Sequence, residues 1–201
     1  MVGNDLVDLA DRDADSRTFS ARFDLRVFTD AERASIRAHT DPARQRWRLW
    51  AGKEAAYKVA RKLDARTVFA PSRFAVELDQ RGSGVARTGR TGTVYRLWLT
   101  ETASRIHVHA ISPGADPAAV VWAWGPVRAG DPSRSARELA IRVLAPRLRA
   151  AAGELEVGRA DRIPVLWLRG APASLDLSLS HHGGWVAFAA LPRPCRQASA
   201  A

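Results

Sequence analysis

The chain has 201 residues, 46% of them hydrophobic, and a mass of 21.9 kDa, which is enough to fill an ordinary core in one domain or in two small ones. Its 31 basic and 21 acidic residues give a net charge of +10 and a sequence pI near 11.1. Such a charge favours an acidic partner: nucleic acid, a membrane surface, or an acidic protein with a phosphorylated ligand. Because the arginines are spread along the whole chain, the charge alone selects none of these.

The sequence near the two termini indicates the cellular compartment of the protein. The amino terminus carries acidic residues where a secretory signal carries basic ones, and no apolar run approaches the roughly 20 residues of a membrane span. Cys195 is the only cysteine and lies in a Pro-, Arg- and Ala-rich tail, so it forms no internal disulfide and is a poor candidate nucleophile. We expect a cytoplasmic protein without a membrane partner, ending in a flexible tail over residues 193–201.

The first third of the chain predicts one strand and two helices. Residues 2–9 alternate apolar and polar positions, as a short strand does, and Gly3 permits close backbone approach. Thr29–Glu32 forms a capping box that predicts a helix to about His39. A longer helix is expected over residues 43–63. Its buried stripe recurs at every fourth residue: Trp47, Ala51, Ala55 and Val59.

The rest of the chain predicts strands, a linker and a second helix. Four strands are expected over residues 73–78, 93–99, 105–111 and 119–124. A Gly- and Pro-containing linker covers residues 125–132, and Ser133 is expected to cap a helix to about Ala151. Three further strands are expected over residues 164–168, 175–180 and 185–191.

The pattern indicates an internal duplication. Residues 53–59 align with residues 137–143, and the strands at 107–112 and 120–124 resemble those at 175–180 and 185–189. We therefore predict an α+β pseudo-dimer, in which a first half (residues 1–125) and a second half (residues 126–192) each lay a long helix on a small antiparallel sheet. A cleft between the halves is the expected ligand site.

Lysine occurs at only three positions, Lys53, Lys58 and Lys62, while every other basic position holds arginine. A lysine is a compact point charge on a flexible stem, which suits contacts to phosphate oxygens. The alternative is a solvated helix face with an i,i+4 pair between Glu54 and Lys58, worth about 0.2–0.5 kcal/mol. The spacing alone does not decide between the two interpretations.

Three segments carry residues suited to chemistry: Val2–Val7, Trp50–Lys58 and Ser178–Trp185. Each has a simple structural explanation by itself. Together they resemble the signature of the 4′-phosphopantetheinyl transferase superfamily, which has a Gly-x-Asp strand, a helix with an aromatic-x-x-Lys-Glu-Ala-x-x-Lys pattern, and a Ser-His turn before a glycine and an aromatic residue. Their order is that of the short holo-acyl-carrier-protein synthases, which build sites between subunits, whereas the fused surfactin-type enzymes place the His turn first. The resemblance implies a fused pseudo-dimer with its site at the internal interface.

The resemblance also implies an activity. Enzymes of this superfamily transfer 4′-phosphopantetheine from coenzyme A to a serine of an acyl, polyketide or peptidyl carrier protein, with Mg2+. The expected partners are therefore coenzyme A and an acidic carrier protein, and the expected state is a monomer. The implied metal ligands are Asp5 and Glu54, the implied catalytic residues are Glu54 and Lys58, and the implied coenzyme A contacts are Lys53, Lys58, Ser180 and His181.

Several positions depart from the pattern or allow another interpretation. Surfactin-type enzymes carry a second acid where this chain has Val7, so Asp8 or water is expected to complete the metal shell. Trp50 and Tyr57 are expected in the core, and Glu138 with Arg142 is expected to be structural. His107 and His109 share a strand face, but spacing supplies no third ligand for zinc.

Two competing functions remain. A basic nucleic-acid-binding domain fits the charge, but the chain has no helix-turn-helix, zinc-finger or RRM signature. A relative that binds coenzyme A or a carrier without catalysis fits the motifs, but Asp5, Glu54 and Lys58 are all present.

Overall fold

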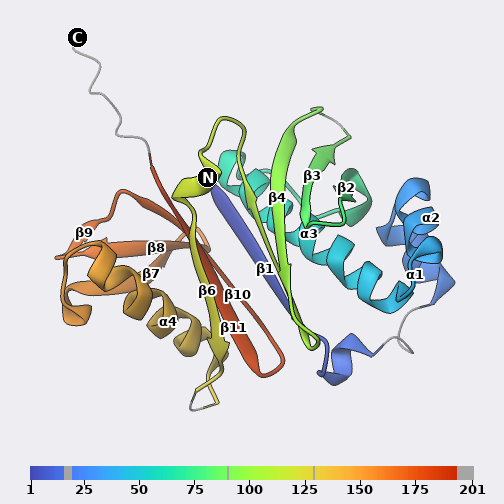
Figure 1. Ribbon diagram of the computed structural model, residues 1–201. Coiled ribbons are helices and arrows are strands. Elements are labelled where there is room, and N and C mark those ends of the chain that lie inside the picture. Colours follow the sequence, from blue (N-terminus) through green and yellow to red (C-terminus); the bar gives the residue numbers. More distant parts are fainter. Residues whose placement is uncertain (16–19, 90, 129, 194–201) are drawn as a thin grey trace, which may run out of the picture.

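Two lobes lie side by side in the computed structural model, which describes residues 1–15, 20–89, 91–128 and 130–193 (Figure 1). Residues 1–120 form the first lobe and residues 121–193 the second. Each lobe packs helix against antiparallel sheet, so the predicted α+β class is confirmed. Cys195 and most of the predicted tail lie outside the described residues.

The first lobe is a five-stranded sheet covered by a long helix. The sheet has the order β1-β5-β4-β3-β2, with every neighbouring pair antiparallel. Its strands are β1 (Val2–Asp8), β2 (Phe74–Leu78), β3 (Ser83–Thr88), β4 (Val94–Glu101) and β5 (Arg105–Ile111). The helices are α1 (Ala21–Val27), α2 (Asp30–Ala38) and α3 (Pro42–Leu63), with short 3-10 turns at Arg12–Ala14, Pro71–Arg73 and Pro117–Ala119.

The predicted capping box is present at the start of α2. Thr29 Oγ1 accepts from the Glu32 amide at 3.3 Å, and Glu32 Oε2 accepts from the Thr29 amide at 2.7 Å. Asp41 caps α3 in a similar way, because its Oδ1 accepts from the Arg44 amide at 2.9 Å. Helix α1 was not predicted, and Ser20 is its N-cap.

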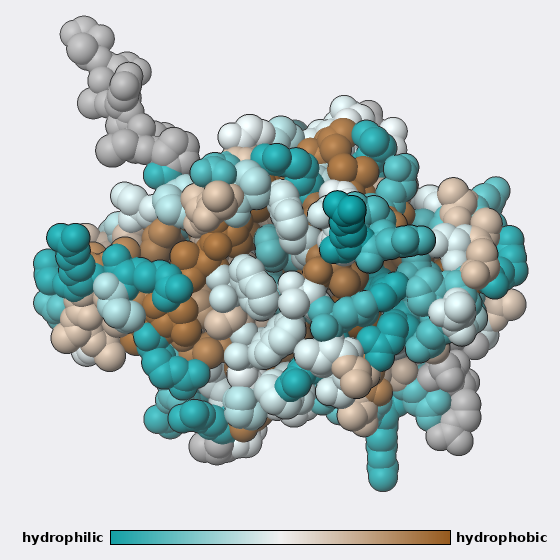
Figure 2. Space-filling model, viewed as in Figure 1, coloured by the Kyte–Doolittle hydropathy of each residue, from teal (hydrophilic) through white to brown (hydrophobic). Residues whose placement is uncertain are grey.

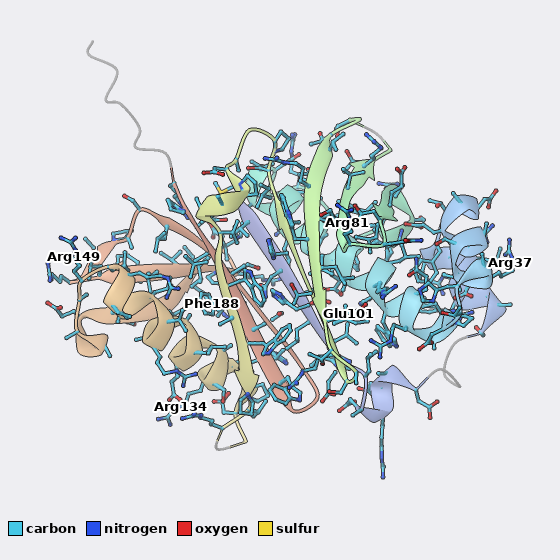
Figure 3. The ribbon with its side chains drawn as sticks, in the orientation of Figure 1. Arg37, Arg81, Glu101, Arg134, Arg149 and Phe188 are labelled. Carbon is cyan, nitrogen blue, oxygen red and sulfur yellow. The ribbon has the colours of Figure 1, made fainter. Side chains whose placement is uncertain are left out.

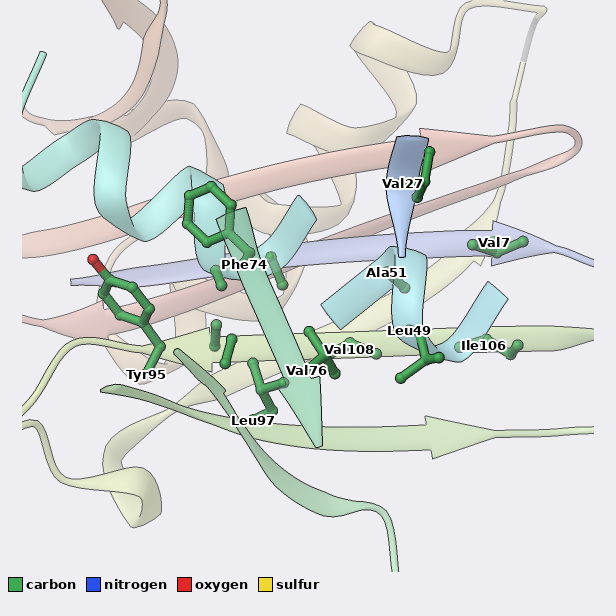
Figure 4. Packing of buried hydrophobic residues seen from close by; sticks show 14 of the residues in the cluster. Val7, Val27, Leu49, Ala51, Phe74, Val76, Tyr95, Leu97, Ile106 and Val108 are labelled. Carbon is green, nitrogen blue, oxygen red and sulfur yellow. The ribbon is translucent and has the colours of Figure 1, made fainter. Parts of the chain in front are cut away.

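The core of the first lobe lies between α3 and the sheet (Figure 4). Ala51, Ala55 and Val59 of the predicted stripe have 0% exposure, and Trp47 at its start is only partly buried. These small side chains let β1 approach the helix closely. A Cβ atom on Gly3 would lie 2.1 Å from Ala55 O, so only glycine fits there. The stripe therefore sets the distance between α3 and β1.

The second lobe packs α4 (Pro132–Arg147) on two three-stranded sheets. One has the order β10-β11-β6 and the other the order β7-β8-β9. The strands are β6 (Val121–Pro126), β7 (Leu155–Ala160), β8 (Ile163–Leu168), β9 (Ala171–Pro172), β10 (Leu175–His182) and β11 (Trp185–Pro192), with a 3-10 turn at Ala152–Glu154. The predicted N-cap Ser133 is wrong, since Asp131 Oδ1 accepts from the Arg134 amide at 2.9 Å, and α4 ends at Arg147 rather than near residue 151.

Strand β6 belongs to a different sheet from the one that the sequence predicted. It was expected with the strands of the first half, but it pairs antiparallel with β11 over residues 121–126. The strands at 120–124 and 185–189 therefore share one sheet, and their resemblance does not relate one lobe to the other. The duplication and its division after residue 125 stay predictions.

The lobes meet where β1 runs beside β10. Asp176 Oδ2 accepts from the Val2 amide at 2.6 Å, and Ser178 Oγ accepts from the Asn4 amide at 3.0 Å. Residue numbers rise together along these two contacts, so β1 and β10 run in the same direction. Both contacts join a backbone amide of β1 to a side-chain oxygen of β10. Lys62 of α3 adds a buried ion pair, with Nζ 2.9 Å from Asp176 Oδ2.

The surface charge is distributed over both lobes. Arg37, Arg81, Arg134 and Arg149 are all exposed, and Arg37 and Arg149 lie at opposite sides of the molecule (Figure 3). Hydrophilic residues dominate the outer margins of the visible face, and more apolar residues gather near β6 (Figure 2). Among the described residues, none of the helices has both the length and the apolar composition that a membrane crossing requires.

Candidate active site between the two lobes

Three residues predicted from the motifs converge between β1 and α3. Lys58 Nζ lies 3.0 Å from Asp5 Oδ1 and 3.7 Å from Glu54 Oε2. The same ammonium donates to Asn4 O at 2.8 Å. The helical spacing of Glu54 and Lys58 puts both on the flank that faces β1, and close packing at Gly3 brings Asp5 within reach.

These groups share one electrostatic environment. Burial raises the pKa of Glu54, and the nearby Asp5 carboxylate raises it further, while Lys58 opposes the shift. Burial works to lower the pKa of Lys58, but Asp5 and Glu54 outweigh it, so the pKa of Lys58 is raised. The site therefore holds a charged ammonium beside a carboxyl group whose pKa is raised.

A cavity of about 250 Å³ opens onto this group from the second lobe. Asp5, Glu54 and Lys58 line one side, and Ser180 and His181 line the other. Trp47, Trp50 and Val7 also line it, so Trp50 contributes to the cavity wall as well as packing against the core as predicted.

A larger cavity of about 520 Å³ adjoins the first, because Lys58 and His181 line both. Its lining combines positive charge with apolar surface. The basic residues are Lys58, Arg61, Lys62, Arg159, Arg162 and His181, and the apolar and aromatic ones include Tyr57, Val68, Phe69, Ile163 and Pro164. Tyr57 was expected only in the core, yet it faces this cavity. Asp161 is the one acidic residue of this lining, so the larger cavity suits an anionic ligand with apolar parts.

Ser180 and His181 lie on β10 just before its turn to β11. Ser180 is buried and its Oγ accepts from Asn4 Nδ2 at 2.9 Å, whereas His181 is exposed and lies on the opposite strand face. The turn needs glycine: Gly183 has φ +53°, and a Cβ there would lie 2.6 Å from Asp8 Oδ2. The predicted Ser-His motif thus brings His181 to the cavities from the second lobe.

Lys53, predicted to contact a phosphate, lies apart from the two cavities. Its side chain has 0% exposure and lines neither cavity. Lys53 Nζ lies 2.7 Å from Glu32 Oε2 and donates to Pro71 O and Phe74 O. Burial lowers the pKa of Lys53, and Glu32 opposes that shift. These three acceptors match the three donors of the ammonium, and the ion pair with Glu32 joins α3 to α2.

Asp8, one candidate for the missing second acid, faces away from Asp5. Its Oδ1 accepts from the Ala10 amide at 3.1 Å and its Oδ2 from the Gly184 amide at 3.2 Å. Asp8 lies outside the lining of the small cavity, where Val7 occupies the position next to Asp5 on the same strand face. Asp8 therefore supports the β10–β11 turn rather than a metal shell.

Two sets of residues outside the motifs have clear partners. His107 and His109 lie away from the cavities, with His107 stacked on Trp122 at 5.0 Å and His109 on Trp98 at 5.4 Å. In the second lobe Glu138 pairs with Arg134 at 2.7 Å rather than with Arg142. These contacts are structural.

Sequence reasoning missed the three arginines of the larger cavity, Arg61, Arg159 and Arg162. Arg61 lies one turn beyond Tyr57 on α3, so the helical period could have found it. Arg159 lies near the end of β7 and Arg162 lies in the turn to β8, and β7 was not predicted. No local signal separates them from the many other arginines of the chain.

Comparison with known proteins identifies the family. The model of the 4′-phosphopantetheinyl transferase superfamily matches residues 1–116, which include Asp5, Glu54 and Lys58. No curated protein gives a significant match. A holo-[acyl-carrier-protein] synthase structure from Neisseria meningitidis is similar at 15% identity and a TM-score of 0.42, over 55% of this chain and 95% of that one. One from Thermotoga maritima is similar at 14% identity and a TM-score of 0.40, over 85% of this chain and 83% of that one. On the match of the family model to more than half of its length, the chain belongs to the 4′-phosphopantetheinyl transferase superfamily.

Proposed function

We propose that this protein transfers the 4′-phosphopantetheine group of coenzyme A to a serine of a carrier protein, in the manner of a holo-acyl-carrier-protein synthase. One observation carries the proposal: Asp5, Glu54 and Lys58 of the first lobe and His181 of the second border two adjoining cavities. Membership of the superfamily supports the same activity.

The donor set of the small cavity fits Mg2+. Asp5 and Glu54 offer two carboxylates that already converge on one cation, the Lys58 ammonium. Among the described residues no group of three or more His, Cys, Asp or Glu is arranged to hold a metal, so two carboxylates would act with phosphate oxygens and water. When bound, Mg2+ would neutralise negative charge on the pyrophosphate.

The transfer itself is a phosphoryl displacement. The serine oxygen of the carrier attacks the phosphorus nearest pantetheine, a new P–O bond forms, and the pyrophosphate P–O bond breaks to release 3′,5′-ADP. Glu54 would accept the serine proton, directly or through water, since burial raises its pKa. Lys58 would hold the charge that develops on the phosphate oxygens, because it stays protonated at neutral pH.

The larger cavity would bind the rest of coenzyme A. Its basic side chains, Arg61, Arg159 and Arg162, suit nucleotide phosphates, and Tyr57 and Phe69 provide flat apolar surface. His181 would contact the 3′-phosphate, with Ser180 supporting the turn that presents it. Lys53 has no place in this arrangement.

The net charge of +10 suits an acidic carrier protein. Because both walls of the site belong to one chain, we propose a monomer as the active form. A monomer is the form expected of a fused pseudo-dimer. The internal duplication behind that expectation rests on the sequence pattern alone.

Mass spectrometry of apo carrier proteins tests the proposal. Each of a panel of fatty-acid, polyketide and peptide carriers is incubated with the protein, coenzyme A and Mg2+. At least one should gain a single phosphopantetheinyl group on its serine, and that gain should disappear when EDTA replaces Mg2+. A folded protein that modifies no carrier on the panel would overturn the proposed function.

A further inference from the structure

Asn4 lies where the two lobes meet, and the transfer chemistry above assigns it no role. It is 0% exposed and stands between Gly3 and Asp5 on β1. Its Nδ2 atom donates to Ser180 Oγ at 2.9 Å and lies 3.3 Å from His107 Nε2. Its Oδ1 atom is buried without a hydrogen-bond partner among the described residues, which is unfavourable, so packing alone would be served as well by an apolar residue.

The main chain of Asn4 reaches both walls of the site. Its carbonyl oxygen accepts from Lys58 Nζ at 2.8 Å, and its amide donates to Ser178 Oγ at 3.0 Å. One residue thus contacts α3 through Lys58 and β10 through Ser178 and Ser180. The side chain makes the contact nearest to His181.

His107 holds the amide in place from the first lobe. Burial lowers the pKa of His107 to about 3, with smaller effects from the charges of His109 and Lys58, so the ring is neutral near pH 7. An amide nitrogen can only donate, and His107 Nε2 therefore accepts. Stacking on Trp122 fixes the ring. Asn4 is held between a fixed acceptor on β5 and Ser180 on β10.

We propose that Asn4 is a positioning residue for coenzyme A: through Ser180, its side chain places His181 opposite Lys58. The inference rests on the proposed function and adds a specific structural requirement to it. The lobes keep other links without this side chain, among them those of Asp176 with Val2 and Lys62 near the start of β10, and that of Asp8 with the Gly184 amide. Loss of the Asn4 side chain should therefore alter the site more than it alters lobe docking.

Calorimetric titration of coenzyme A in the presence of Mg2+ tests the role directly. The full chain is compared as wild type, Asn4→Leu, His181→Ala and the double variant. Asn4→Leu keeps the approximate volume but removes both donors, and its Kd for coenzyme A should rise about tenfold. With His181→Ala already present, Asn4→Leu should add less than twofold, because its effect passes through His181.

Gln45→Leu is the matched control. Gln45 is also a buried amide, 7% exposed, and its Nε2 donates to Ser35 Oγ at 3.0 Å, but it lines neither cavity. The Gln45→Leu variant should lower Tm by an amount similar to Asn4→Leu and leave the Kd for coenzyme A unchanged. A purely structural Asn4 would behave as Gln45 does.

The outcomes separate the two proposals. A wild-type protein that does not bind coenzyme A overturns the proposed function and this role with it. If the wild type binds coenzyme A and Asn4→Leu binds it equally well, the positioning role is overturned and the function stands. The same conclusion follows if Asn4→Leu raises the Kd by the same factor in the wild type and in His181→Ala. Should Asn4→Leu fail to fold, Asn4→Ser, whose hydroxyl is too short to reach both partners, is judged by the same criteria.

Discussion

Lys58 Nζ lies 3.0 Å from Asp5 Oδ1, although 53 positions separate the two residues in the chain. The contact forms because Gly3 lets β1 lie against the small side chains of α3. It links the Gly-x-Asp strand to the Lys-Glu-Ala helix. The candidate site is therefore built on the packing of one strand against one helix.

Glu54→Gln should abolish transfer while leaving the protein at least as stable at pH 7. The variant keeps the shape of the side chain but accepts no proton and is a poor metal ligand. The pKa of Glu54 is higher in the folded state than its ordinary value, so ionisation destabilises the fold as pH rises through the folded-state pKa. Removing that ionisation should raise Tm slightly at pH 7 and have no effect below pH ~4.

Mass spectrometry and thermal unfolding at both pH values check this prediction. Glu138→Gln is the control, since Glu138 also pairs with a base four residues away but lies outside the cavities. Full activity in Glu54→Gln would exclude Glu54 as the proton acceptor. A large fall in Tm at pH 7 would contradict the raised pKa.

Lys58→Arg should lower kcat/KM for coenzyme A by at least tenfold. Lys58 Nζ contacts three oxygens at once, from Asp5, Glu54 and Asn4, and a planar guanidinium cannot reproduce that geometry. Arg66→Lys is the reverse exchange at an exposed position and should change nothing. Steady-state kinetics with one carrier protein decides, and unchanged kinetics in Lys58→Arg would remove Lys58 from the site.

Lys53→Met should lower the free energy of unfolding and leave the binding of coenzyme A unchanged. The variant leaves the Glu32 carboxylate buried without its cation, a change that typically costs about 3–5 kcal/mol. Denaturant unfolding should show that loss. The fraction that remains folded should bind coenzyme A with the wild-type Kd, and a weaker Kd there would restore Lys53 to the ligand site.

His109→Phe should flatten the acid side of the stability profile. Burial lowers the pKa of His109 to about 4, so between pH ~6.5 and 4 the unfolded chain binds a proton at this position and the folded protein does not. Wild-type stability therefore falls as pH falls through this window. The variant keeps an aromatic ring against Trp98. Its free energy of unfolding should fall less steeply than that of the wild type, by up to about 1.4 kcal/mol per pH unit. Denaturant unfolding from pH 7 to 4 measures both slopes. Equal slopes would contradict the prediction.

The elements predicted correctly are those with local signals. The capping box at Thr29 and the apolar stripe of α3 depend on residues three or four positions apart, and both are present. Strand β3 was missed because Gly84 and Arg87 interrupt its apolar pattern. Hydrogen bonding to β2 and β4 on its two sides stabilises it instead.

The candidate site was partly predictable for the same reason. The i,i+4 spacing places Glu54 and Lys58 together, whereas Lys53 is about 140° around the helix from Lys58, so the period itself argues against a shared face. The contact between Asn4 and Ser180 joins residues 176 positions apart and depends on lobe docking. No local pattern could reveal it.

A crystal structure of the protein with coenzyme A and Mg2+ tests the central claim most directly, namely that one chain forms one complete site between its lobes. We predict a metal held by Asp5 and Glu54, the pyrophosphate beside Lys58, and the nucleotide in the larger cavity near His181. Coenzyme A bound elsewhere on the chain, or bound between Glu54 of one molecule and His181 of another, would contradict the account.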